Sequence, residues 1–214
     1  MKINLRIGAV GYLVLIMSAN LVPAIAVQQA PAGTLRSSGK VQVDGKDATP
    51  DLAVNSGSTV QTAKGSSAVV SLGKLGRVEV QPGSSVKLSL DGSTIGIETA
   101  KGSAVVSLGK LGRVEVHEGS TIKLTADTAS VTTMLSAGRV RVSSSSGMTA
   151  TVSTKDGQVV AVGANEFVVD VSCGNTAVRV NSGTAELRAG SGTKQIAAGN
   201  QDSAGTAKDG CKSL

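Results

Sequence analysis

Apolar and polar residues alternate along short stretches of the chain from residue 39 onward. A period of two places apolar side chains on one face of a strand and polar side chains on the other. The stretches are rich in Val, Thr and Ile, and Gly-Ser, Asp-Gly and Gly-Asn steps separate them. The segment 129–135 comes nearest to a helical pattern, but its Val-Thr-Thr run favours a strand. We therefore expect strands at Val41–Val43, Arg77–Val80, Val86–Leu90, Arg139–Val142, Val169–Val171 and Val178–Val180.

An internal duplication is the strongest feature of the sequence. Ala68–Val80 recurs unchanged as Ala104–Val116, an offset of 36 residues, and the wider similarity relates 62–90 to 99–126. A unit of this length holds three or four short strands, which is typical of stacked β-coils. The sequence therefore predicts an all-β fold, either β-solenoid-like or a stacked β-sandwich of short strands.

The first 26 residues have the features of a secretory signal peptide. Lys2 and Arg6 precede an apolar run at 7–22, and Ala24-Ile25-Ala26 offers small residues for cleavage. An uncleaved membrane anchor is the alternative, but polar residues and a proline interrupt the run, which is short for a membrane span. We expect cleavage, export to the periplasm or the medium, and no membrane span in the mature protein.

The remaining chain divides into a linker at 27–38, an all-β domain at 39–200 and a small polar tail at 201–214. Export places Cys173 and Cys211 in a compartment where disulfides persist. We expect these two cysteines to pair and to tie the tail to the domain, with two free thiols as the alternative.

Composition and charge exclude several classes of protein. A hydrophobic content of 40% is too high for a disordered chain. The net charge of +6 falls to +4 without Lys2 and Arg6, too mild an excess to favour nucleic acid. Stacked repeats would bring six basic residues into one stripe, which is either a solvated face or a polyanion-binding groove. Those residues are Lys74, Arg77, Lys87, Lys110, Arg113 and Lys123, and Glu79 and Glu115 dilute the stripe.

Candidate chemistry is sparse. His117 is the single histidine, and Gln81 takes its place in the first copy of the repeat, so we expect a surface histidine rather than a catalytic base. The carboxylates are scattered and form no calcium-loop pattern. Phe167 is the one aromatic residue after the signal peptide, and we expect it in the core. We expect no enzyme activity, no catalytic residues, no metal and no cofactor.

The order of short motifs resembles the FecR-like domain family. The motifs include Gly39-x-Val41-x-Val43-x-Gly45, Gly57-Ser58-x-Val60-x-Thr62, Gly76-Arg77-Val78-x-Val80, Ala137-Gly138-x-Val140 and Thr176-x-Val178-x-Val180. The resemblance covers about residues 39–200. It implies an all-β periplasmic domain, in a family whose named members relay the state of an outer-membrane transporter to a sigma factor.

These features predict an exported interaction or scaffold module at the cell envelope, with another envelope protein or a surface polymer as its partner. Three alternatives stay open. The first is an accessory sensor in transporter and sigma-factor signalling. The second is a polysaccharide-active β-helix enzyme, although the mature chain lacks the aromatic platforms that sugar subsites use. The third is an adhesive or surface polymer that self-associates.

Overall fold

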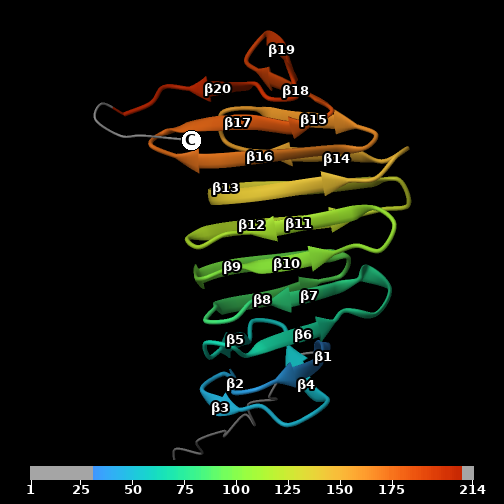
Figure 1. The fold of residues 1–214 in the computed structure, drawn as a ribbon, viewed down its shortest axis with the longest axis vertical. Helices are drawn as coiled ribbons and strands as arrows, with labels where there is room; N and C mark the ends of the chain where they lie inside the picture. Colours follow the sequence, from blue (N-terminus) through green and yellow to red (C-terminus); the bar gives the residue numbers. More distant parts are fainter. Residues whose placement is uncertain (1–30, 209–214) are drawn as a thin grey trace, which may run out of the picture.

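The computed structural model describes residues 31–208, which form an all-β structure, as the alternation predicts (Figure 1). The expected strands are all present, and 129–135 lies almost wholly within a strand. The short 3-10 helix η1, Gly73–Leu75, interrupts them. The strands are β1 Pro31–Ser38, β2 Val41–Val43, β3 Lys46–Asp47, β4 Leu52–Asn55, β5 Thr59–Thr62, β6 Ser67–Ser71, β7 Arg77–Val80, β8 Ser85–Asp91, β9 Thr94–Lys101, β10 Ala104–Ser107, β11 Gly112–Val116, β12 Ser120–Ala126, β13 Ser130–Ser144, β14 Thr149–Ser153, β15 Gln158–Val162, β16 Asn165–Ser172, β17 Asn175–Ser182, β18 Thr184–Ala189, β19 Gly192–Ala197 and β20 Gln201–Gly205.

The strands form one curled sheet with two ladders, and the long strand β13 belongs to both. Ladder A runs in the order β4-β1-β6-β7-β10-β11-β13-β16-β17-β20. Ladder B runs β3-β2-β5-β8-β9-β12-β13-β14-β15-β18-β19. All pairs are antiparallel except β13 with β14. The finer expectation, solenoid-like or sandwich-like stacking, stays a prediction.

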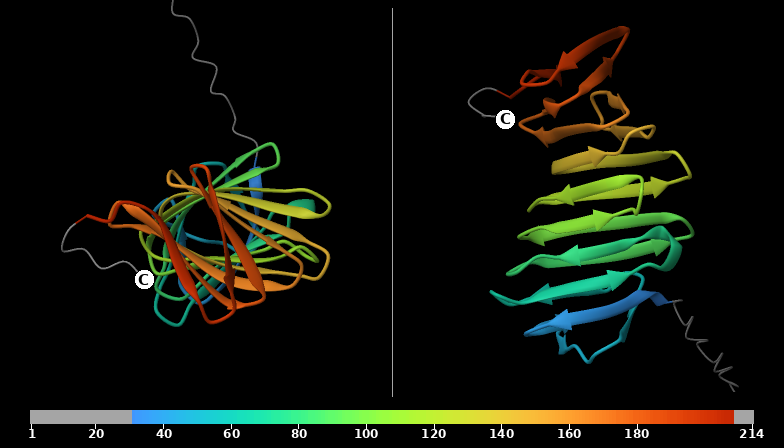
Figure 2. Two further views of the ribbon diagram at one scale, coloured as in Figure 1. Left: turned by 90° about the horizontal axis from the view of Figure 1, so that it is seen from above. Right: turned by 45° about the vertical axis from the view of Figure 1, so that its right-hand side comes forward.

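The chain places hairpins alternately in the two ladders. The hairpin β6–β7 lies in ladder A, β8–β9 in ladder B, β10–β11 in ladder A, and β12 pairs with the first half of β13 in ladder B. The two sequence copies therefore form equivalent strands: each copy supplies one hairpin to ladder A and one strand, β8 or β12, to ladder B. The strands follow one another along the long axis of the molecule, from the N-terminal strands at one end to the C-terminal strands at the other, and the two copies lie side by side in the middle (Figure 2).

A single hydrophobic core lies between the ladders, because every second side chain of each strand points inward. Phe167 is fully buried, which confirms its expected place in the core. It continues a cross-strand row of aliphatic residues in ladder A. That row is Leu35, Val70, Val78, Val106, Val114, Val142, Phe167 and Val180.

The domain extends beyond the expected bounds at both ends. Part of the expected linker is the strand β1, which lies between β4 and β6 with Leu35 fully buried. Part of the expected tail is β20, which pairs with β17 and buries Ala204. Both β1 and β20 place few apolar side chains in the core, so the alternation of apolar and polar residues in these two strands is too weak to detect in the sequence.

Two expectations lie wholly or partly outside the described residues. The signal peptide at 1–26 is one, and Cys211, the expected partner of Cys173, is the other. Within residues 31–208, no helix has the length and apolar character that crossing a membrane requires.

Candidate functional site

The six basic side chains that were expected to form one stripe lie in three different places. The chain passes from ladder A to ladder B after β7 and again after β11, which separates residues that are close in sequence. The single stripe is therefore wrong, although each repeated pair occupies equivalent positions. Arg77 and Arg113 lie on ladder A, Lys87 and Lys123 on ladder B, and Lys74 and Lys110 at the turns after β6 and β10.

Arg77 and Arg113 occupy one groove on the outer side of ladder A. Ser107 is the cross-strand partner of both arginines, from opposite sides, so the arginines are two strands apart. Ser71 flanks Arg77, and Ser143 flanks Arg113. The order Ser-Arg-Ser-Arg-Ser thus crosses five neighbouring strands. We call this the serine–arginine groove, and its volume is about 580 Å³.

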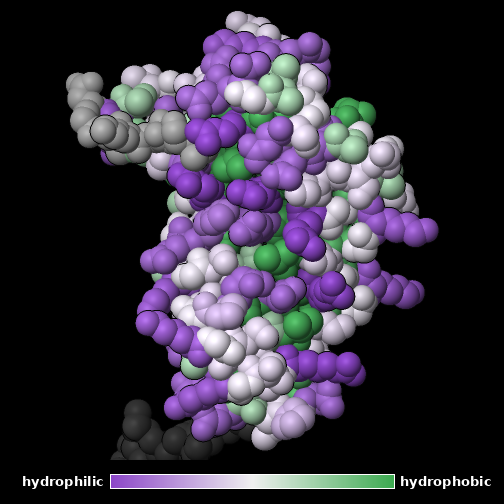
Figure 3. Space-filling view, viewed as in Figure 1, coloured by the Kyte–Doolittle hydropathy of each residue, from purple (hydrophilic) through white to green (hydrophobic). Residues whose placement is uncertain are grey.

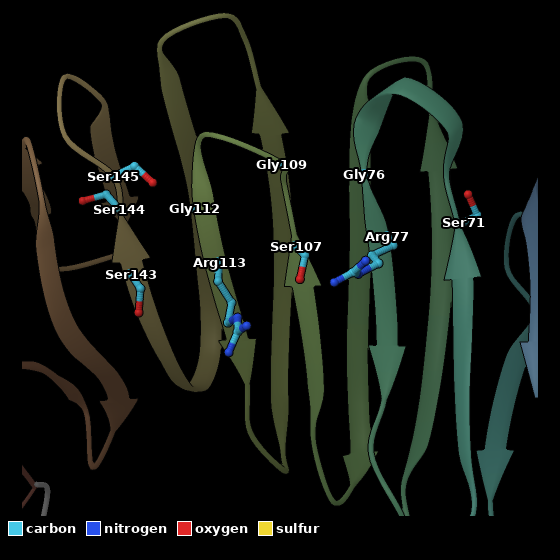
Figure 4. Close-up of a pocket in the computed structure, with 10 residues that line it drawn as sticks. All are labelled: Ser71, Gly76, Arg77, Ser107, Gly109, Gly112, Arg113, Ser143, Ser144 and Ser145. Carbon is cyan, nitrogen blue, oxygen red and sulfur yellow. The ribbon is translucent and has the colours of Figure 1, made fainter. Parts of the chain in front are cut away.

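Figure 4 shows how the groove is built, with Arg77 reaching from β7 toward the strand that carries Ser107. Both arginines are exposed, and Ser107 and Ser143 are half-buried. Guanidinium and hydroxyl groups all donate hydrogen bonds, and the guanidinium carries a permanent positive charge. The groove therefore offers donors and positive charge to whatever occupies it.

The two arginines differ from the other arginines that the structure describes. Arg36, Arg139, Arg141 and Arg188 each pair with a carboxylate, and Arg179 donates to the Gln201 side chain. Among residues 31–208, only the guanidinium groups of Arg77 and Arg113 have neither an ion pair nor a side-chain hydrogen bond. These two cations are available to an external anion without first breaking a contact within the protein.

Two glycines allow neighbouring strands to lie close together at the groove. Gly76 and Gly112 have φ angles of 113° and 135°, which side-chain-bearing residues rarely adopt. A Cβ at Gly76 would collide with the Ser107 carbonyl oxygen, and one at Gly112 with that of Ser143. Glycine at these positions therefore allows neighbouring strands to approach beside the arginines.

A row of acidic residues lies on the same strands, two positions after Arg77 and Arg113, as the sequence predicts. Glu79 and Glu115 are both cross-strand partners of Val105. Glu115 lies 3.9 Å from Arg141 and 3.9 Å from His117. The acidic row is therefore partly neutralised by neighbours other than Arg77 and Arg113. Figure 3 shows hydrophilic side chains along the full length of one face, with hydrophobic areas between them.

His117 follows β11 and is half-buried. Its Nε2 atom lies 3.9 Å from Glu115 Oε1, and no serine hydroxyl within residues 31–208 forms a hydrogen bond with its ring. Among these residues, no three His, Cys, Asp or Glu side chains gather as a metal site would require.

Cys173 lies in the turn between β16 and β17, with a φ of 55°. Its carbonyl oxygen accepts a hydrogen bond of 2.7 Å from the backbone N–H of Lys208. The chain leading to Cys211 therefore passes directly beside Cys173. Their pairing stays a prediction, since Cys211 lies outside the described residues.

Sequence reasoning found the two arginines but missed the serines and glycines beside them. Ser71, Gly76 and their counterparts Ser107 and Gly112 lie within the duplicated segment, so their repetition was the available signal. Ser143 lies outside the exact repeat, and only the register of β11 with β13 places it beside Arg113.

Comparison with known proteins finds a weak structural similarity to some solved structures. No protein-family model matches the sequence, and a search of curated proteins finds no relative. One solved structure, a proposed anti-sigma factor from Parabacteroides distasonis ATCC 8503, is 15% identical with a TM-score of 0.44. The likeness covers 54% of this chain and 60% of that one.

A second structure, also a proposed anti-sigma factor from that strain, is 18% identical with a TM-score of 0.41. The likeness covers 49% of this chain and 55% of that one. This chain therefore spans little more than half the length of either protein. At these scores the likeness supports no argument about function.

Proposed function

We propose that this protein is an exported, non-enzymatic interaction module of the cell envelope that binds an anionic surface polymer in its serine–arginine groove. The observation that carries the proposal is the pair of exposed, unpaired guanidinium groups of Arg77 and Arg113, with serine hydroxyls between and beside them. The expected signal peptide supports the location.

The spacing of the arginines favours an extended ligand. Neighbouring strands are about 4.8 Å apart, so the backbones of β7 and β11 are about 10 Å apart. A linear polymer with an anionic group on each or every second unit reaches both guanidiniums at once. Each contact with a carboxylate or phosphate is a charge-assisted hydrogen bond, which the serine hydroxyls supplement.

The rigid setting of the groove reduces the cost of binding. Each arginine lies on a strand that is paired on both sides, and its inward neighbours Val78 and Val114 are buried in the core. The backbone positions are therefore fixed before a ligand arrives, and mainly the two side chains lose freedom on binding.

The test is calorimetric titration with oligogalacturonate, a linear polymer of carboxylated sugars. The double variant Arg77→Gln/Arg113→Gln should bind at least about tenfold more weakly than the wild type, because two charged donors are lost. Arg188→Gln is the matched control, since Arg188 is exposed on ladder B and already paired with Glu186. Equal binding by the double variant and the wild type would contradict the proposal.

A second experiment, recovery of ligands from an envelope extract with the same two proteins, separates this function from the accessory-sensor alternative. Purified protein should recover anionic polymer from an envelope extract, and the double variant should not. Recovery of a transporter or a membrane regulator by both proteins alike would favour the sensor and would contradict the groove as the binding site.

A further inference from the structure

A second hollow of about 360 Å³ lies on the outer side of ladder A, and it shares no lining residue with the serine–arginine groove. His117 and Glu118 come from the end of β11 and the turn after it, Arg139 from β13, and Asp170 from β16. We call it the Asp170 pocket. A role of the Asp170 pocket can therefore be tested separately from that of Arg77 and Arg113.

Asp170 is the unusual residue of this pocket. It is only 5% exposed, although its side chain lies on the outer side of the ladder. Its Oδ2 atom accepts a hydrogen bond of 2.8 Å from Arg139 Nε. Its Oδ1 atom is buried and has no hydrogen-bond partner. A buried carboxylate oxygen without a donor is costly, so this atom is a ready acceptor for a donor that enters the pocket.

The two copies of the repeat diverge at this pocket. Thirteen consecutive residues, Ala68–Val80 and Ala104–Val116, are identical. The next two positions are Gln81 and Pro82 in the first copy but His117 and Glu118 in the second, and both of the latter line the pocket. These two changes add an acidic side chain and an imidazole to the pocket that Asp170 lines.

The charges of the pocket favour a cationic donor. Arg139 offsets the charge of Asp170, and Glu118 leaves one negative charge in excess when His117 is neutral. Glu118 is held at the rim, where one oxygen accepts a hydrogen bond of 3.3 Å from the Gly102 backbone N–H. A primary ammonium group has three N–H donors, no acceptor and a positive charge, which match two carboxylates with free acceptor positions.

We propose that the Asp170 pocket binds the primary ammonium group of a cationic ligand, and glucosamine oligomers are the probe for it. In the bound state the ammonium nitrogen donates to Asp170 Oδ1 and to the Glu118 carboxylate. No covalent step is involved. The proposal does not rest on the serine–arginine groove, and it holds whether or not that groove binds a polymer.

The test is an NMR titration of the full mature chain with two matched probes. Glucosamine trimer carries free ammonium groups, and N-acetylglucosamine trimer has the same sugar backbone with those charges removed. The glucosamine trimer should shift the backbone amide signals of Gly138, Arg139 and Asp170, and the acetylated trimer should not.

Variants then assign the effect to Asp170. Asp170→Asn should weaken binding of the glucosamine trimer about tenfold, because the carboxylate charge is lost. Asp202→Asn is the matched control, since Asp202 also accepts from a cation, Lys194, but lies at the end of ladder A. It should bind as the wild type does.

A further variant keeps the test valid if Asp170→Asn fails to fold. Glu118→Gln changes an exposed side chain and should weaken binding about threefold without changing the unfolding temperature. Equal binding of both trimers, unchanged binding by Glu118→Gln, or unchanged binding by a folded Asp170→Asn protein would each overturn the proposal.

Discussion

The hydroxyl of Ser120 holds the backbone of Arg139 at the point where β13 passes from ladder B to ladder A. Ser120 Oγ accepts a hydrogen bond of 2.8 Å from the Arg139 N–H and donates one of 3.0 Å to the Arg139 carbonyl. Ser84 accepts from the Ser103 N–H, and Asn165 from the Thr184 N–H, again across 19 residues. A buried side-chain acceptor therefore fixes each of these crossings between the ladders.

Substitution of Ser120 tests this arrangement. Ser120→Ala should lower the free energy of unfolding by about 1–3 kcal/mol, because the Arg139 N–H loses its partner. Urea unfolding followed by circular dichroism measures the change. Ser89→Ala, at an exposed position of β8, is the control and should change stability by no more than about 0.5 kcal/mol. Equal effects at both sites would show that the crossing hydrogen bonds do not stabilise the fold.

Two glycines that line the serine–arginine groove, Gly109 and Gly112, should tolerate substitution unequally. Gly109 and Gly112 both have positive φ angles, of 62° and 135°. A Cβ at Gly109 meets nothing within 4 Å, whereas one at Gly112 collides with the Ser143 backbone. Gly109→Ala should cost about 1 kcal/mol, and Gly112→Ala should cost more, because two strands must separate. Thermal unfolding of the two variants makes the comparison, and similar losses would contradict the close approach.

Phe167 should be the largest single contributor to the core. It is flanked in ladder A by Val142 and Val180, so no neighbouring ring can fill its volume. Phe167→Ala should destabilise the protein by about 3–5 kcal/mol, and Phe167→Leu by clearly less, because leucine leaves a smaller cavity. Urea unfolding measures both variants, and a Phe167→Ala protein as stable as the wild type would place the ring outside the core.

The predicted disulfide can be tested chemically. Cys173 lies beside Lys208, three residues before Cys211. Exported protein should have a mass two hydrogens below that of the reduced chain, and peptide mapping should join the two cysteines. Cys173→Ser should lower stability by up to about 4 kcal/mol through the longer unconstrained chain. Quantitative thiol labelling of the unreduced, denatured protein would refute the bond.

Acid should destabilise the turn between β12 and β13. The Ser130 hydroxyl, and then the Ala129 and Ser130 backbone N–H groups, hold the pKa of Asp127 below its ordinary value of 3.8. Because the folded pKa is the lower one, the stabilisation is present above about pH 3.8 and is lost as the pH falls through the folded pKa. Unfolding midpoints in urea between pH 6 and pH 2 should show a loss that is smaller in Asp127→Asn. An equal acid dependence in both proteins would exclude this turn as a cause.

The sequence was sufficient for the strands that bury alternate aliphatic residues. Arg77–Val80 and Val178–Val180 were found because their inward positions are all valine. It was insufficient for β1, where Leu35 stands among small and polar residues. It also could not assign strands to ladders, since alternation looks the same on either one.

The same limit applies to the candidate sites. Arg77 and Arg113 were found because the repeat doubles them, but Lys87 and Lys123 were grouped with them wrongly, since the crossings between the ladders leave no signal in charge or hydropathy. Asp170 was counted among scattered carboxylates. Only the register of β16 with β13 brings it to Arg139.

On the proposal made above, the outer side of ladder A, and not that of ladder B, binds an anionic polymer. NMR titration of the wild-type protein with oligogalacturonate tests it most directly, because each backbone amide reports its own surroundings. The amide signals of Arg77, Ser107 and Arg113 should shift, and those of Lys87 and Lys123 should stay unchanged. Shifts centred on Lys87 and Lys123, or none on ladder A at saturating polymer, would contradict it.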